Sequence, residues 1–105
     1  MTIKFRRYRG DTFRFDVAVQ EDDGAARDLT DATIRFSLGS YTEDTEGVLI
    51  ERNDLDGKFT VTISYELMEN LTEETYQFDV ELTYANGFRE TLFVAILILS
   101  DDVTP

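Results

Sequence analysis

The chain of 105 residues contains no cysteine, no histidine and no tryptophan, and it has a single proline. Without cysteine it can form no disulfide, no thiolate metal site and no thiol nucleophile. Cysteine usage therefore does not indicate whether the protein works in a reducing or an oxidising compartment. Without histidine it also lacks the side chain most often used for proton transfer near neutral pH. These absences exclude the commonest catalytic and metal-binding arrangements.

Basic residues are also scarce. Ten lysines and arginines face 22 aspartates and glutamates, which gives a net charge of −12 at pH 7. A protein of this charge repels nucleic acid phosphates and anionic lipid headgroups. We therefore expect neither a nucleic acid partner nor a membrane partner.

Long apolar runs are missing from the start of the chain and from its middle. The first segment, "MTIKFRRYRGDTFRF", has no apolar stretch long enough for the core of a signal peptide, and no segment reaches the length of a membrane-spanning helix. We expect the protein to be made and used without secretion.

What is present suits one folded domain. Hydrophobic residues make up 42% of the chain and include eight phenylalanines and five tyrosines, so there is enough apolar surface to oppose disorder despite the charge. Because 105 residues leave no room for two separate cores, we expect residues 1–105 to form a single domain.

The dominant hydrophobic period is two, which predicts half-buried antiparallel strands. It is clearest in "TFRFDVAVQ", "ATIRFSLG", "KFTVTISY" and "TYQFDVELTY", and the segments "TIKFRRY", "GVLIERN" and "ETLFVAILIL" complete a set of seven strands. Polar turn clusters that hold all six glycines separate the strands. The segment "YELMENLTEE" is too short for more than a turn between the fifth and sixth strands.

Seven short strands with polar turns predict an all-β fold, a seven-stranded immunoglobulin-like antiparallel β-sandwich, with a small barrel as the second choice. Tyr76 opens the sixth strand five residues after Leu71. Such sandwiches often carry a tyrosine there, whose hydroxyl bonds to the backbone of the preceding corner. We expect a structural role for Tyr76, because a buried phenol needs a fixed partner.

The last strand is apolar on both faces, unlike the others. A type I′ turn at Asn86-Gly87 predicts a register that pairs Tyr84 with Arg89, Leu82 with Thr91, Val80 with Phe93, Phe78 with Ala95 and Tyr76 with Leu97. Cross-strand partners share a face, so this register turns Phe93, Ala95, Leu97 and Leu99 toward the core.

The opposite face of this strand then carries an apolar row, Leu92, Val94, Ile96 and Ile98. Monomers seldom expose such a row, so we expect a partner to cover it. The alternative is an internal cover by the first strand or by residues 41–48. A three-residue turn would swap the faces and still leave an apolar outer row, with Phe93, Leu97 and Leu99 outside.

Charge is unevenly distributed along the chain. Residues 1–14 hold five basic residues against Asp11, a local charge of +4 that leaves −16 on the remaining residues; the basic residues are Lys4, Arg6, Arg7, Arg9 and Arg14. Two interpretations stay open, a solvated basic strand and a docking arm for an acidic neighbour. Under the second, Lys4, Arg6, Arg7 and Arg9 belong to an interface.

No pattern in the chain points to catalysis or to a cofactor. The acids fall mostly in turns, where water solvates them like other surface carboxylates. No serine lies in a "GxSxG" or "SxxK" motif. The "NDLDG" segment resembles a calcium loop only superficially, because aligning Gly57 puts Arg52 and Ile63 where carboxylates are required. We expect a turn there, no catalytic residues, no metal ligands, no cofactor and no small-molecule substrate.

Several segments in order are similar to the small immunoglobulin-like domains of tailed-phage virions: "GDTFRFDVAV", "RDLTDATIRFSL", "DGKFTVTIS", "LTEETYQFDVELTYANG" and "DDVTP". Related modules include the N-terminal domain of baseplate upper proteins and adaptors at the base of tail or head fibres. The chain is much shorter than a baseplate upper protein. The resemblance implies a structural virion protein, assembled in the cytoplasm of the bacterial host, and implies no enzymatic activity.

The sequence therefore predicts a non-enzymatic subunit of a tailed-phage virion, in the tail, baseplate, fibre adaptor or head decoration, which docks and oligomerises through its C-terminal strand. Its expected partners are other virion proteins and further copies of itself. The alternative is a β-sandwich module that binds carbohydrate or Ca²⁺. Glycan recognition favours exposed aromatic residues in loops, where the sequence offers only Tyr41.

Overall fold

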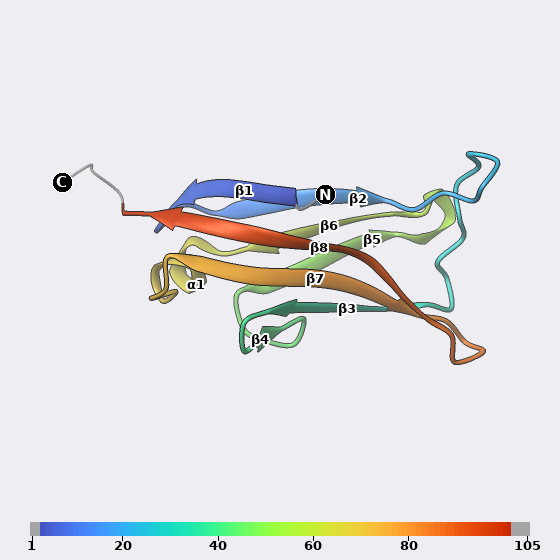
Figure 1. Cartoon of the computed structure of the whole chain (residues 1–105). Helices are drawn as coiled ribbons and strands as arrows, with labels where there is room; N and C mark the ends of the chain where they lie inside the picture. Colours follow the sequence, from blue (N-terminus) through green and yellow to red (C-terminus); the bar gives the residue numbers. More distant parts are fainter. Residues whose placement is uncertain (1–2, 102–105) are drawn as a thin grey trace.

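The computed structural model describes residues 3–101, which form two β-sheets packed face to face (Figure 1). One sheet has five strands in the order β1 (Ile3–Tyr8), β8 (Arg89–Ser100), β7 (Thr75–Thr83), β3 (Thr33–Leu38) and β4 (Tyr41–Thr42). The other has three, in the order β2 (Phe13–Ala18), β6 (Lys58–Ile63) and β5 (Val48–Asn53). The 3₁₀ helix η1 (Asp54–Asp56) joins β5 to β6, and the helix α1 (Tyr65–Glu69) joins β6 to β7.

The sandwich prediction is confirmed, and all seven expected strands are present. The two-residue strand β4 was not expected. The expectation of purely antiparallel pairing is wrong for one pair, because β1 runs parallel to β8. An alternating pattern predicts that a segment is a strand, but it does not predict its direction. The segment "DDVTP", one part of the phage resemblance, lies outside the described residues beyond Asp101.

The core between the sheets is built around phenylalanine. Phe78 on β7 is 1% exposed, and its ring centroid lies 5.5 Å from that of Phe15 and 5.8 Å from that of Phe13, both on β2. Each such ring contributes roughly 1.5–3 kcal/mol when fully buried. The inward rows of β2 and β7 therefore hold the two sheets together.

The basic N-terminal segment is an integral strand. Phe5 on β1 packs against Phe13, with ring centroids 5.4 Å apart, and against Phe78 at 5.7 Å. The backbone of β1 pairs with β8 from Ile3, opposite Ala95, to Tyr8. The strand interpretation of this segment is confirmed, because the alternating residues of β1 contribute to the core. Docking of its basic residues onto an acidic neighbour stays a prediction.

The hairpin between β7 and β8 differs from the expected type I′ turn. Residues 85–87 form a three-residue loop in which the Tyr84 N–H donates to the Phe88 carbonyl at 2.8 Å, and Gly87 alone adopts a positive φ, of 89°. The predicted pairs near the turn, Tyr84 with Arg89 and Leu82 with Thr91, are wrong by one residue, since Leu82 pairs with Glu90.

A β-bulge farther along the hairpin corrects this shift. The register changes between Val80 and Glu81, because Leu92 is an extra residue on β8. The predicted pairs of Val80 with Phe93, Phe78 with Ala95 and Tyr76 with Leu97 are therefore confirmed. From Phe93 onward the two faces of β8 are as expected, and the alternative in which they are exchanged is wrong.

The connection from β6 to β7 supplies a lid at one end of the core. The Ser64 hydroxyl accepts a hydrogen bond from the Leu67 N–H and caps α1, which buries Leu67 and Met68. This agrees with the expectation of a single turn. No helix among residues 3–101 is long and apolar enough to cross a membrane.

Candidate docking surface

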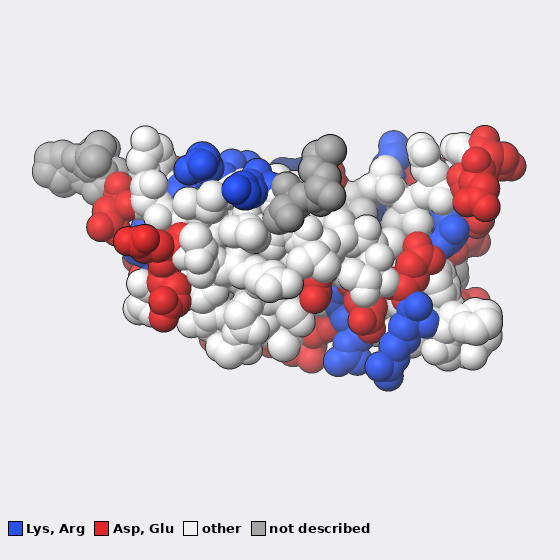
Figure 2. Space-filling model, in the orientation of Figure 1, with Lys and Arg blue, Asp and Glu red and all other residues white. Residues whose placement is uncertain are grey.

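An apolar row runs along the outer face of β8, as the sequence predicts. Val94, Ile96 and Ile98, here called the outer stripe, alternate with the buried residues Ala95, Leu97 and Leu99. Val94 is 41% exposed, and the other two side chains are partly buried. In the view of Figure 2 the surface over β7 and β8 is largely uncharged.

Leu92 does not belong to this row, so the expectation for this residue is wrong. It lies at the bulge, where the alternation of faces is interrupted, and it is a partly buried residue packed against the core. Sequence periodicity alone carries no sign of the extra residue, because Leu92 and Phe93 are both apolar.

The outer stripe lies inside the sheet, not at its edge. β8 pairs with β1 on one side and β7 on the other. The first strand and residues 41–48 were the expected internal covers. β1 lies beside β8 in the same sheet, and β4 begins the segment 41–48 at the far end of that sheet, next to β3. Among the described residues, neither segment forms a layer over the outer stripe.

Basic side chains border the outer stripe along β1. Lys4 pairs with Ile96 and Arg6 pairs with Ile98, and since paired residues share a face, both bases lie on the outer face. Both side chains are exposed, and their aliphatic stems can shield part of the neighbouring isoleucines. Figure 2 shows basic residues above the uncharged middle of this face and acidic residues at both ends.

On the β7 side the neighbours are mostly polar and uncharged. Ile98 pairs with Thr75 and Ile96 with Gln77, and only Val94 lies beside an acid, Asp79. The surface thus consists of an apolar row with a basic border on one side. A partner that fits it would present an apolar surface flanked by acids.

The other two basic residues expected in the interface serve the domain itself. The guanidinium carbon of Arg7 lies 5.2 Å from the centroid of the Phe13 ring and 5.7 Å from that of Phe5, a cation–π arrangement. Arg9 forms an ion pair with Asp101 at 3.1 Å. The expectation that Arg7 and Arg9 share a docking surface with Lys4 and Arg6 is therefore wrong, because their side chains point to the core side and to the end of β8.

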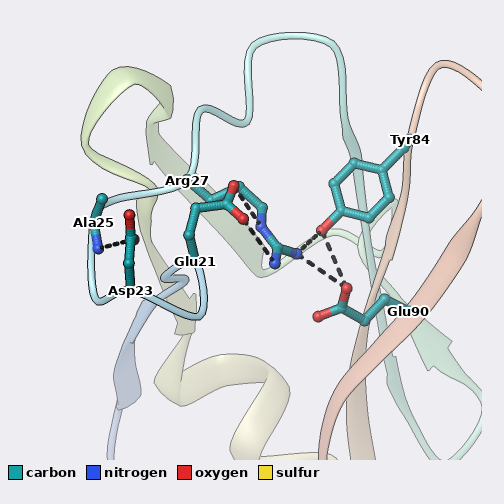
Figure 3. Close-up of polar contacts among 6 residues, drawn as sticks. All are labelled: Glu21, Asp23, Ala25, Arg27, Tyr84 and Glu90. Carbon is teal, nitrogen blue, oxygen red and sulfur yellow. Dashed lines mark hydrogen bonds and ion pairs between the residues drawn. The ribbon is translucent and has the colours of Figure 1, made fainter.

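At the other end of the sandwich, Arg27 links two loops (Figure 3). Its Nη1 donates to the Tyr84 hydroxyl at 2.7 Å and to Glu90 at 3.0 Å, and its Nε donates to Glu21 at 3.2 Å. The hydrogen bonds to Tyr84 and then to Glu21 raise the pKa of Arg27 above its ordinary value. This arrangement fastens the β2–β3 loop to the β7–β8 hairpin.

The same end exposes two large apolar residues that sequence reasoning missed. Leu55 in η1 is 75% exposed, and Phe88 after the hairpin loop is 71% exposed. Their loops lie at one end of the sandwich (Figure 1), and the Leu29 N–H donates to the Asp54 carbonyl, which links the β2–β3 loop to η1. Tyr41, the only loop aromatic expected to be exposed, is instead packed against the core. The expected two-residue turn at Asn86-Gly87 hid this exposure. A three-residue loop over residues 85–87 would have placed Phe88 at the end of the hairpin, where it is exposed.

The "NDLDG" segment forms the predicted turn. Asp54 pairs with Arg52 at 2.8 Å, the Asn53 amide donates to Asp56 at 2.9 Å, and Gly57 adopts a φ of 65°. The carboxylates of this loop therefore bond to their own neighbours. No group of three or more acidic, histidine or cysteine side chains within residues 3–101 is arranged to hold a metal ion.

Comparison with known proteins gives similarity in fold only. No family model and no curated protein matches the chain. Among solved structures, a mutant of the SrpA adhesin from Streptococcus sanguinis is 13% identical with a TM-score of 0.60, and the match covers 97% of this chain and 56% of that one. The titin M3 domain is 16% identical with a TM-score of 0.57, over 94% of this chain and 88% of that domain.

A third neighbour is the GspB Siglec domain, 14% identical with a TM-score of 0.54, over 94% of this chain and 54% of that one. The chain thus spans little more than half the length of the SrpA adhesin structure and of the GspB structure. These likenesses establish an immunoglobulin-like β-sandwich. The neighbours are adhesin, titin and Siglec domains.

Proposed function

We propose that this chain is a non-enzymatic structural subunit that docks onto neighbouring proteins through the outer face of β8 and β1. The observation that carries the proposal is the outer stripe: Val94 is 41% exposed, and among the described residues no layer covers it or the two isoleucines that follow in the same row.

Physical arguments support this role. Three aliphatic side chains in a row on a solvent-facing sheet are stabilised when a partner removes them from water, by about 25 cal/mol for each Å² of apolar surface buried. Lys4 and Arg6 along the border add complementarity to an acidic partner. The arrangement provides recognition by shape and charge.

We further propose that the assembly is a tailed-phage virion, built in the cytoplasm of the bacterial host, in which other virion proteins and other copies of the chain are the partners. This part rests on the sequence resemblance, from "GDTFRFDVAV" to "LTEETYQFDVELTYANG". An immunoglobulin-like fold is compatible with the modules named there.

Mass spectrometry of gradient-purified particles, from a phage or prophage that encodes this chain, tests the virion role. We expect the chain in a fixed ratio to the major coat protein across preparations. Its absence from particles that carry all other structural proteins would exclude this role.

A second candidate function has one observation in its favour. Phe88 is 71% exposed beside the loops that Arg27 fastens, and an exposed aromatic ring in a fixed loop suits carbohydrate binding. Glycan-array binding that is lost in Phe88→Ala and kept in Leu55→Ala would favour this candidate.

A further inference from the structure

We infer that copies of this chain join head to tail, with strand β1 of one copy pairing with strand β5 of the next. The inference rests on the proposed role as a docking subunit, but it uses the edges of the sandwich and leaves the outer stripe for another partner. Its partner is a second copy of this chain.

The first argument is the number of unpaired strand edges. β1 pairs only with β8, and β2 and β5 each pair only with β6, so within residues 3–101 each of these three strands offers one side of its backbone to a further strand. Each has six residues. The outward charges of β2 are mixed, Arg14 and Asp16, and Asp16 already accepts a hydrogen bond from the Thr60 hydroxyl at 2.7 Å, so β2 offers no edge of one charge. Such edges are ready templates for pairing with another chain. β4, at the other end of the five-stranded sheet, has two residues and is too short for this purpose.

The second argument is the opposite charge of the two edges. Lys4 and Arg6 are exposed on β1. Glu51 is exposed on β5, and the segment leading into that strand carries three further acids, Glu43, Asp44 and Glu46. Among the ion pairs of residues 3–101, none involves Arg6 or Glu51. Both residues are therefore available to a neighbour.

These charges also select the mode of pairing. Two β1 strands placed against each other would bring basic residues together, and two β5 strands would bring acids together; like charges in opposite positions destabilise a strand pair. Pairing β1 with β5 instead places opposite charges across the junction. The charge pattern thus opposes a two-fold dimer and favours a head-to-tail contact.

Apolar exposure at the two edges indicates an antiparallel register. If Arg6 lies opposite Glu51 in an antiparallel pair, Tyr8 lies opposite Leu49. Tyr8 is 51% exposed and Leu49 is 55% exposed, and their contact would remove both from water. The parallel alternative would place Tyr8 opposite Asn53, a polar and exposed residue.

A contact between two different edges leaves one β1 and one β5 free at the ends of each open assembly. Such contacts close into rings when the rotation between copies permits it and otherwise grow into filaments. The sandwich thus carries the means to build a repeating array from one subunit.

Charge reversal in the full chain tests the inference by sedimentation velocity. We expect the native chain to form concentration-dependent oligomers, Arg6→Glu and Glu51→Arg each to weaken self-association at least about tenfold, and the double variant Arg6→Glu with Glu51→Arg to recover it. Thermal melts of all four proteins check that each is folded, which is expected because both side chains are exposed.

A native chain that stays monomeric at its highest soluble concentration would overturn the inference, as would oligomers that neither single reversal weakens. If oligomers survive both reversals but are lost in Ile96→Lys with Ile98→Lys, copies meet through the outer stripe. In that case the edge inference fails while the proposed docking role stands.

Engineered cysteines test the register, since the chain has none of its own. Tyr8→Cys with Leu49→Cys should give disulfide-linked ladders on a non-reducing gel, whereas Tyr8→Cys with Asn53→Cys should not. Within one copy the bond cannot form, because β1 and β5 belong to different sheets about 10 Å apart, and β6 separates β5 from β2. Ladders from the Asn53 pair alone, or from neither pair, would contradict the antiparallel register.

Discussion

The Tyr76 hydroxyl accepts a hydrogen bond from the Thr72 N–H at 2.9 Å and a second from the Glu73 N–H at 3.1 Å. Tyr76 begins the inward row of β7, and its ring lies under Gly39, where an added Cβ would come within 3.1 Å of the ring. This is the structural role that the position of Tyr76 predicts, and it fixes the corner between α1 and β7.

Removing that hydroxyl should lower stability without altering the fold. Tyr76→Phe removes the acceptor of two backbone N–H groups on exposed residues, so water can partly replace the hydroxyl; the loss should be about 1 kcal/mol, which lowers Tm by several degrees. The measurement is a thermal or urea melt. Tyr65→Phe is the matched control, because Tyr65 is 52% exposed; an equal loss in both variants would show that the corner bonds do not stabilise the domain.

Strand β1 should be necessary for stability, because Phe5 contacts both Phe13 and Phe78. Phe5→Ala should destabilise the domain by about 3 kcal/mol, the low end for a phenylalanine truncation because the side chain is only partly buried. Tyr8→Ala, at an exposed position of the same strand, should cost far less. Urea denaturation compares both variants with the native chain; a native midpoint for Phe5→Ala would mean that packing of β1 against the core does not stabilise the domain.

The Arg27 contacts should hold the β2–β3 loop in place. Arg27→Gln removes the charge between Glu21 and Glu90 and should increase the rate at which a protease cuts within residues 20–27, with a loss of about 1 kcal/mol in global stability. Arg89→Gln, a charge removal at an exposed position of β8, is the control. Cleavage at the native rate in Arg27→Gln would show that the loop is fixed by other contacts.

The two faces of β8 should respond differently to charge. Ile96→Lys with Ile98→Lys should stay folded and become more soluble, because both side chains lie on the outer face, where the added ammonium groups can reach water. Leu97→Lys should unfold the domain, because Leu97 is 0% exposed and lies opposite Tyr76. Circular dichroism distinguishes the outcomes. Unfolding of both proteins would show that the outer stripe is ordinary core.

Much of this architecture is predictable from the sequence because burial follows a period of two. Phe13, Phe15 and Phe78 all lie on the predicted inner faces. The local sequence pattern indicates neither which strand pairs with β1 nor in which direction, because both depend on contacts between the two ends of the chain. It also missed the bulge at Leu92, because an extra apolar residue in an apolar run leaves no mark on the alternation.

The candidate surface was predictable only in part, because it also depends on contacts between segments that are distant in the sequence. Val94, Ile96 and Ile98 follow from register and turn chemistry. The separate roles of Arg6 and Arg7 depend on which side of β1 faces the core, and only the packing of Phe5 shows this. The exposure of Phe88 depends on the length of the hairpin loop.

The most direct test of docking through the outer stripe is the rate at which a maleimide labels Ile96→Cys, in the isolated chain and in purified particles. Ala25→Cys, in the exposed β2–β3 loop, is the matched reference, and either cysteine is the only one in its chain. We predict that assembly slows labelling at position 96 at least about tenfold relative to position 25, because the partner excludes water from the stripe. Equal relative rates in the isolated chain and in particles would contradict docking through this face.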